Sequence, residues 1–153
     1  MAGLEKSDFN AALGAALKSL AAFEKFSAEV ETFLEQKGYA ESIRAHVLDH
    51  LIRKRLLDDA RCAELAVRRL NEKGAGPEKI RTTLERRGAS AETVETAMAG
   101  INSSPDQLQQ ILTKKFRTPV TREKAARFLY SRGFSQEEIE AALDLWSGRA
   151  SQC

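Results

Sequence analysis

Apolar residues recur every three to four positions along almost the whole chain, which is the spacing of amphipathic α-helices. The first stretch is marked by Phe9, Leu13, Leu17, Leu20 and Phe23, and others follow around residues 30–34, 43–52 and 65–70. Ser27 is suited to cap the second helix, and Asp58 or Asp59 the fourth. No segment alternates polar and apolar residues as a half-buried β-strand does. The pattern predicts an all-α fold.

Three glycines punctuate this pattern at similar intervals. Gly38, Gly88 and Gly133 lie 50 and 45 residues apart, and each has a leucine four residues earlier and Lys or Arg immediately before it. A glycine in this place predicts a residue with positive φ that ends the helix, and the cation suits the negative end of the helix dipole. We therefore expect three tandem three-helix repeats that form an elongated array.

The repeat predicts a first unit at residues 1–57, which includes an N-terminal extension, a second at 58–102 and a third at 107–153. The connector at 103–106 is rich in serine and proline, as linkers are. Within the second unit, the turn Gly74-Ala75-Gly76-Pro77 predicts a helix stop followed by a proline that opens the next helix. The turn lacks the lysine and hydroxyl pair of a phosphate-binding loop, so we interpret it as structural.

The composition, 42% apolar and 30% charged, is typical of a globular protein. No apolar run reaches the ~20 residues that span a bilayer, and acidic residues occupy the N-terminal stretch where a signal peptide is positive or apolar. We expect a cytoplasmic monomer that does not associate with membranes. Cys62 lies in an apolar helical pattern and is expected to be buried, and the other cysteine, Cys153, ends the sequence.

Residues that could support catalysis do not assemble into a known pattern. His46 and His50 are one helical turn apart with Asp49 between them, but a catalytic zinc site needs a third protein ligand and a base of suitable reach. Glu138 forms a capping box with Ser135 instead of an acid–base pair. Trp146 is expected to pack against the third unit. We predict no enzyme activity, no metal and no cofactor.

Charge is distributed in bands that the net charge of +2 conceals. Residues 61–88 carry eight basic and four acidic side chains, and residues 114–132 carry seven basic and one acidic. Such bands attract and orient a nucleic-acid backbone or an acidic protein groove. The residues expected to bind a partner are Arg61, Arg68, Arg69, Lys79, Arg81, Arg86, Arg87, Lys114, Lys115, Arg117, Arg122, Lys124, Arg127 and Arg132.

Several motifs occur in an order that resembles the RecX family of bacterial recombination regulators. These are LDDAR at 57–61, GAGPEKIR at 74–81, RRG at 86–88 and RGFSQEEIEAAL at 132–143. The resemblance covers roughly residues 15–145. It implies a non-enzymatic modulator of RecA that binds in the groove of the RecA filament on single-stranded DNA. Such a protein restrains ATP hydrolysis, strand exchange and co-protease activity, and so regulates DNA repair, recombination and the SOS response.

Two other functions remain compatible with the sequence. One is a helical DNA-binding protein that acts directly through phosphate contacts, and RecX-like filament binding is itself compatible with weak direct DNA binding. The other is a helical scaffold for an unrelated acidic protein. Selective binding to the RecA filament, compared with naked DNA, would separate the first hypothesis from these two.

Overall fold

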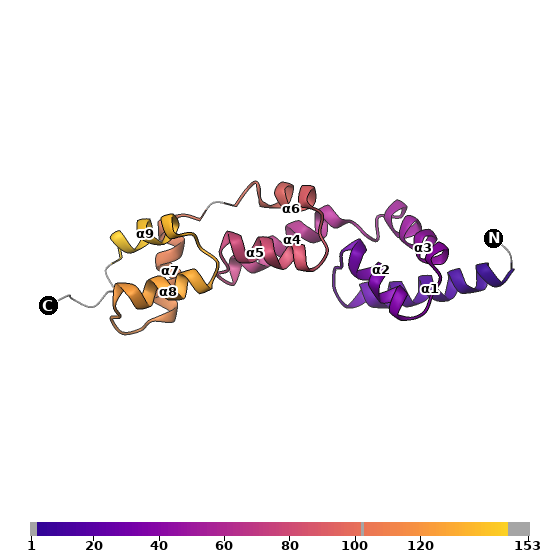
Figure 1. Ribbon diagram of the computed structural model, residues 1–153, viewed down its shortest axis with the longest axis horizontal. Helices are drawn as coiled ribbons and strands as arrows, with labels where there is room; N and C mark the ends of the chain where they lie inside the picture. Colours follow the sequence, from indigo (N-terminus) through magenta and orange to yellow (C-terminus); the bar gives the residue numbers. More distant parts are fainter. Residues whose placement is uncertain (1–2, 102, 147–153) are drawn as a thin grey trace. The chain divides into compact units, whose positions relative to one another are not determined.

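The computed structural model describes residues 3–101 and 103–146, and within them the chain forms nine α-helices (Figure 1). The prediction of an all-α fold is confirmed. The helices are α1 Gly3–Ala22, α2 Ser27–Gln36, α3 Glu41–Arg53, α4 Asp59–Glu72, α5 Pro77–Arg86, α6 Ala91–Met98, α7 Pro105–Lys115, α8 Arg122–Ser131 and α9 Gln136–Asp144. No helix in the described part of the chain is both long and apolar enough to cross a bilayer.

The described residues form two compact units. The first contains the residues up to 65 together with 84–96, and the second contains 66–83 together with the residues from 97 onward. The boundaries pass through α4, α5 and α6. The two compact units are therefore a different division from the three-helix units expected at 1–57, 58–102 and 107–153, which stay a prediction.

The first unit has its core where α1, α2 and α3 pack around one another (Figure 1). Each helix contributes apolar residues at helical spacing, so that the apolar faces meet and exclude water. Burying each large aliphatic side chain stabilises the unit by roughly 1.5–3 kcal/mol. The buried members of this cluster are Ala12, Ala16, Val30, Leu34, Ile43, Val47, Leu51 and Leu57.

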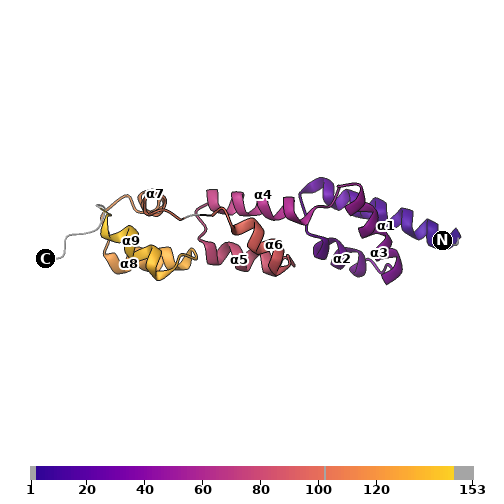
Figure 2. The same cartoon turned by 90° about the horizontal axis from the view of Figure 1, so that it is seen from above.

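The second unit has its core among α7, α8 and α9, which lie together in Figure 2. Trp146 follows α9 and is buried in this core, as the sequence predicted. Its indole adds a large apolar surface beside the smaller aliphatic side chains. The other buried members are Leu108, Leu112, Ala125, Leu129, Phe134, Ile139, Ala142 and Leu143.

The glycine stops form as the sequence predicted. Gly38, Gly88 and Gly133 have φ values of 89°, 96° and 94°. In each case the N–H of the next residue donates to the carbonyl of the buried leucine four residues before the glycine, at 3.1–3.3 Å. This bond satisfies a carbonyl that the helix end would otherwise leave without a partner. Gly74 ends α4 in the same way, with φ of 85°.

Most of the predicted caps are confirmed, and one is wrong. Ser135 and Glu138 form a capping box at α9, and Asp58 accepts a bond from the N–H of Arg61 at 3.1 Å. Ser27 does not cap α2, because it is the first residue of that helix and Phe26 holds the cap position. The N–H and Oγ of Ser27 instead donate to Asp59, at 2.8 and 2.9 Å. This partner lies 32 residues away, beyond the reach of a local sequence pattern.

Candidate partner-binding surface

The basic residues predicted from the first block lie on α4, on α5 and directly after α5, and they differ in how many contacts they already make within the fold. Arg68, Arg69, Lys79 and Arg86 are exposed. Arg61 is ion-paired with Glu24 at 3.1 Å, while Arg81 and Arg87 are half-buried.

Arg87 is a structural residue of the first unit. Its Nη2 donates to Glu29 Oε1 at 2.9 Å and to the main-chain oxygen of Glu24 at 3.2 Å, and its Nε donates to Glu29 Oε2 at 3.3 Å. The guanidinium also lies 4.8 Å from the ring centre of the buried Phe26. Burial acts to lower the pKa of Arg87, but the hydrogen bond and the charge of Glu29 outweigh it and raise the pKa. Arg87 therefore holds the beginning of α2 to the end of α5.

Cys62 is buried beside this arginine, as the sequence predicted. Burial raises the pKa of its thiol to about 11, against the opposing effect of the Arg87 charge, whose Nη2 lies 3.9 Å from Sγ. A thiol with such a high pKa is almost entirely protonated at neutral pH, so it is a poor nucleophile and a poor metal ligand.

The histidines lie in a different part of the first unit. His46 is exposed, and the ring of His50 packs edge-on against Phe9 with centroids 5.9 Å apart. Asp49 is ion-paired with Arg53 at 2.8 Å. Among the described residues, no group of three or more His, Cys, Asp or Glu side chains is arranged to hold a metal ion.

The second basic block lies on α7, on α8, in the loop between them and at Arg132, which directly follows α8. Lys114, Lys115, Arg117, Lys124 and Arg127 are exposed. Arg122 pairs with Asp144 at 2.8 Å, and Arg132 is half-buried beside Phe128.

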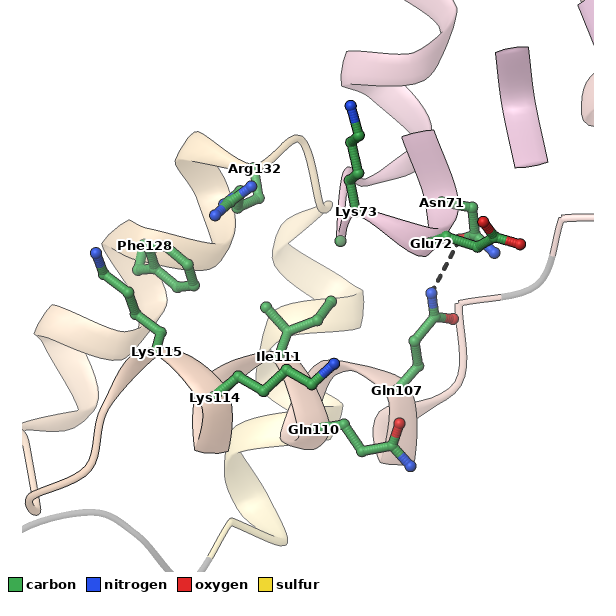
Figure 3. A pocket seen from close by; sticks show the side chains of 11 residues that line it. Asn71, Glu72, Lys73, Gln107, Gln110, Ile111, Lys114, Lys115, Phe128 and Arg132 are labelled. Atoms are coloured by element: carbon green, nitrogen blue, oxygen red, sulfur yellow. Dashed lines mark hydrogen bonds between the residues drawn. The ribbon is translucent and has the colours of Figure 1, made fainter. Parts of the chain in front are cut away.

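Three predicted residues meet at a hollow of about 470 Å³ in the second unit, which we call the basic hollow (Figure 3). Its lining comes from α7, from the end of α4 and from the end of α8. The cations are Lys73, Lys114, Lys115 and Arg132, the amides are Asn71, Gln107 and Gln110, and the remaining residues are Glu72, Gly74, Ile111 and Phe128. The other predicted residues lie outside this hollow.

The four cations of the basic hollow are not neutralised by the fold. In the part of the chain that the structure describes, none of them has a carboxylate oxygen within 4.0 Å. The ammonium of Lys115 and the guanidinium of Arg132 lie 5.5 and 5.1 Å from the centre of the Phe128 ring. Figure 3 shows these two cations beside Phe128, with Ile111 between them and the amides of Asn71 and Gln107.

Two glycine turns fix the walls of the basic hollow. The N–H of Gly76 donates to the carbonyl of Arg132 at 2.6 Å, and the N–H of Glu78 donates to the carbonyl of Gly133 at 3.1 Å. A Cβ at Gly76 would lie 2.4 Å from the Gly133 carbonyl carbon, so the two backbones touch without room for a side chain. The predicted helix stop at Gly74 and helix start at Pro77 are confirmed, and the turn holds the end of α8 beside α4.

The sequence pattern missed the uncharged half of this lining. Lys73 lies in the first basic block, but Gln107, Gln110 and Phe128 carry no charge and did not stand out. A signal was nevertheless present, because the polar residues Gln110, Lys114 and Lys115 of α7 lie three, seven and eight positions after Gln107. That spacing places them on one helix face.

Comparisons with known proteins relate the chain to one family. A model of the RecX second three-helix domain matches residues 58–98, and one of the RecX third three-helix domain matches residues 105–143. The chain is 36% identical to "Regulatory protein RecX" of Chromohalobacter salexigens over 135 residues, which are 84% of this chain and 88% of that protein. It is 32% identical to the protein of the same name from Pseudomonas entomophila, over 88% of each.

A solved structure agrees in fold. The crystal structure of RecX from Lactobacillus salivarius matches with a TM-score of 0.80 and 22% sequence identity, covering 91% of this chain and 96% of that chain. The resemblance that the sequence motifs indicated is thus confirmed.

Proposed function

Since the chain belongs to the RecX family, we propose that it is a non-catalytic regulator of the recombinase RecA. It binds the RecA filament assembled on single-stranded DNA and lowers its ATP hydrolysis, strand exchange and co-protease activity. Through these effects it regulates DNA repair and homologous recombination. Membership of the family indicates RecA as the partner, and the surface charges of the chain support the proposed mode of binding.

The observation that carries the proposal is the repetition of exposed cations in both matched three-helix domains. Lys79 and Arg86 are exposed on α5, and Lys124 and Arg127 are exposed on α8. None of the four has a carboxylate within 4.0 Å among the described residues. A filament repeats its binding surface, so contacts in two domains reinforce each other through a high effective concentration.

A groove between α8 and α9 adds a protein-binding feature to the second unit. Its floor contains the apolar side chains of Ala126, Ile139 and Leu143, and Arg127 and Tyr130 contribute to its lining. Tyr130 is 74% exposed. Tyrosine and arginine are the residue types that most often anchor protein interfaces, which suits a protein partner more than a bare phosphate backbone.

Three predicted binding residues are less suited to this role. Arg61, Arg87 and Arg122 already have carboxylate partners at 3.1, 2.9 and 2.8 Å. A partner would have to break these pairs before using the cations. The experiment should therefore change exposed cations, which contribute little to the stability of the fold.

The test is the variant Lys79→Glu, Arg86→Glu, Lys124→Glu and Arg127→Glu. Its matched control is Lys6→Glu, Lys18→Glu, Lys37→Glu and Lys54→Glu, which reverses the same number of exposed charges in the first unit. Affinity is measured for RecA assembled on single-stranded DNA, for RecA alone and for the DNA alone, at several salt concentrations. RecA-driven ATP hydrolysis and strand exchange are measured in parallel.

We expect the wild-type protein and the control to bind the filament in preference to either component and to slow both activities. The test variant should lose at least about tenfold in affinity, and its residual binding should depend less on salt. Unchanged inhibition by a folded test variant would contradict the role given to these cations. Equal affinity for filament and naked DNA would instead support direct DNA binding through phosphate contacts.

A further inference from the structure

The basic hollow has the charge of an anion-binding site. Lys73, Lys114, Lys115 and Arg132 line the same hollow from three helix segments, and Glu72 is the one carboxylate in the lining. Cations that share a concave surface repel one another, and the low-dielectric wall strengthens that repulsion. A bound anion would relieve it. For Arg87, in contrast, the fold supplies the counter-charge itself, through Glu29.

The uncharged part of the hollow narrows the choice of anion. Gln107 Nε2 donates to Asn71 Oδ1 at 2.9 Å (Figure 3). The bond uses one donor of Gln107 and one acceptor lone-pair direction of Asn71, and it holds the two amides side by side. The bond leaves Gln107 Oε1 as an acceptor and Asn71 Nδ2 as a donor for a ligand. This pair complements the edge of a nucleobase, which offers a donor and an acceptor together. The carboxylates of an acidic peptide offer only acceptors, so the donor to such a pair would have to come from the peptide backbone.

Two of the cations and two of the amides lie apart within one cavity. Lys115 and Arg132 lie beside Phe128, the amides of Asn71 and Gln107 lie on the other side, and Ile111 is between them (Figure 3). The volume of about 470 Å³ falls in the range of sites for small molecules. A ligand with a charged end and a planar polar end joined by a less polar part would satisfy all three regions.

We propose that the basic hollow binds a nucleotide, with its phosphates at Lys114, Lys115 and Arg132 and its base at Asn71 and Gln107. The nucleotide is either free in solution or one unit of a single strand, because both present the same phosphate and base chemistry. This site goes beyond the regulation of RecA proposed above. It uses residues that the four-reversal variant leaves unchanged, so the two proposals can fail separately.

Isothermal titration calorimetry on the full chain tests the site with four probes. They are adenosine diphosphate, a ten-residue single-stranded thymidine oligonucleotide, inorganic phosphate and a deca-glutamate peptide. The variants are Lys114→Gln with Lys115→Gln, the same pair with Arg132→Gln, and Gln107→Leu. The control is Lys18→Gln with Lys37→Gln and Lys54→Gln, all exposed cations of the first unit. Circular dichroism and thermal unfolding confirm that each variant is folded.

We expect the diphosphate, the oligonucleotide or both to bind more tightly than inorganic phosphate and deca-glutamate. Replacing Lys114 and Lys115 by glutamine should weaken nucleotide binding by about tenfold, and the additional change Arg132→Gln should weaken it further. Gln107→Leu should weaken nucleotide binding several-fold and leave inorganic phosphate binding unchanged, because phosphate does not reach the amides. The control should bind as the wild type does.

The pattern over the two nucleotide probes identifies the source. Binding of adenosine diphosphate alone assigns the site to a free nucleotide, and binding of the oligonucleotide alone assigns it to a single strand. Three results would overturn the proposal: binding of neither nucleotide probe, nucleotide affinity unchanged in the folded lysine-pair variant, or deca-glutamate binding as tight as that of the nucleotides. If the change at the half-buried Arg132 unfolds the chain, the variant with only Lys114→Gln and Lys115→Gln still tests the proposal.

Discussion

The stops Arg87-Gly88 and Arg132-Gly133 have nearly the same local sequence and backbone, yet their arginines lie in opposite electrostatic environments. The two glycines have φ of 96° and 94°, and the leucine four residues before each is fully buried. Arg87 meets Glu29 at 2.9 Å and the buried ring of Phe26. Arg132 lines a hollow that contains three lysines.

The Arg-Gly motif therefore determines the backbone conformation of the stop, but not the contacts that its arginine side chain makes. In both stops, glycine and leucine end the helix by the same hydrogen bond. The role of the arginine then depends on the segment that the tertiary fold brings opposite to it. In the first unit α2 supplies a carboxylate, and the arginine becomes part of the fold. In the second unit α7 supplies lysines, and the arginine has no carboxylate partner among the described residues.

The largest loss in the free energy of unfolding should come from substituting the glycines of the helix stops by alanine. A Cβ at Gly133 would lie 2.6 Å from the backbone nitrogen of Lys79, whereas a Cβ at Gly38 would meet nothing within 4 Å. Both substitutions carry the cost of positive φ, about 1–2 kcal/mol. Gly133→Ala adds an overlap with backbone, so we expect a loss of about 3 kcal/mol or more in the free energy of unfolding, against about 1 kcal/mol for Gly38→Ala. Urea unfolding followed by circular dichroism measures both.

Gly88→Ala tests the same comparison at the third helix stop. Its Cβ would lie 2.5 Å from the Cβ of Ala28, a side-chain methyl instead of backbone. We expect a loss between those of the other two variants. Equal losses at Gly38 and Gly133 would show that the backbone contact at Gly133 does not constrain the second unit.

The next largest effect on the free energy of unfolding should distinguish Arg87 from Arg132. Arg87→Gln should lower the free energy of unfolding by about 2 kcal/mol, because it leaves Glu29 and the Glu24 carbonyl partly buried without their donor. Arg132→Gln should change it by less than about 0.5 kcal/mol, because no carboxylate loses a partner. A double-mutant cycle with Glu29→Gln measures the coupling, and a coupling near zero would refute the structural role of Arg87.

The thiol next to Arg87 gives a smaller, pH-dependent effect. The pKa of Cys62 is about 11 in the folded chain and near 9.0 when unperturbed, so the folded chain keeps the proton to higher pH. The resulting stabilisation is complete below pH 9 and is lost as the pH rises from 9 to 11. In a Cys153→Ser background, the difference in unfolding free energy between Cys62 and Cys62→Ala chains should therefore shrink across this window. A constant difference would contradict the raised pKa.

The smallest expected effect is the change in stability with salt concentration. Raising sodium chloride from 0.05 to 0.5 M should stabilise the wild type by a few tenths of a kcal/mol through screening of the repulsion in the basic hollow. The gain should be smaller in Arg132→Gln, which has one cation fewer there. Thermal unfolding of the two proteins at both concentrations measures it, and an identical gain would mean that Arg132 does not contribute to this repulsion.

The features that the sequence predicted correctly are local ones. Helical periodicity, the glycine stops and the capping box at Ser135 depend on residues within a few positions of each other. The burial of Cys62 and Trp146 followed from the same periodicity. The family motifs were informative for a similar reason, because they preserve the order of these local signals along the chain.

The features that the sequence could not predict depend on distant segments. Ser27 looked like a cap, but its partner Asp59 lies 32 residues away. The sequence predicted Arg87 as a partner-binding cation, but in the fold its guanidinium contacts Glu29 and Phe26. The basic hollow combines residues from α4, α7 and α8, and only the tertiary fold brings them together.

The contact between the Gly76 turn and the Arg132-Gly133 stop also has a consequence for the order of events during synthesis. The N–H groups of Gly76 and Glu78 leave the ribosome some 55 residues before the carbonyls that accept their bonds. At roughly 5–20 residues per second, these donors wait about 3–11 seconds for their partners. A nascent chain therefore exposes this turn until its last third is made, and a chain released before residue 132 never closes it.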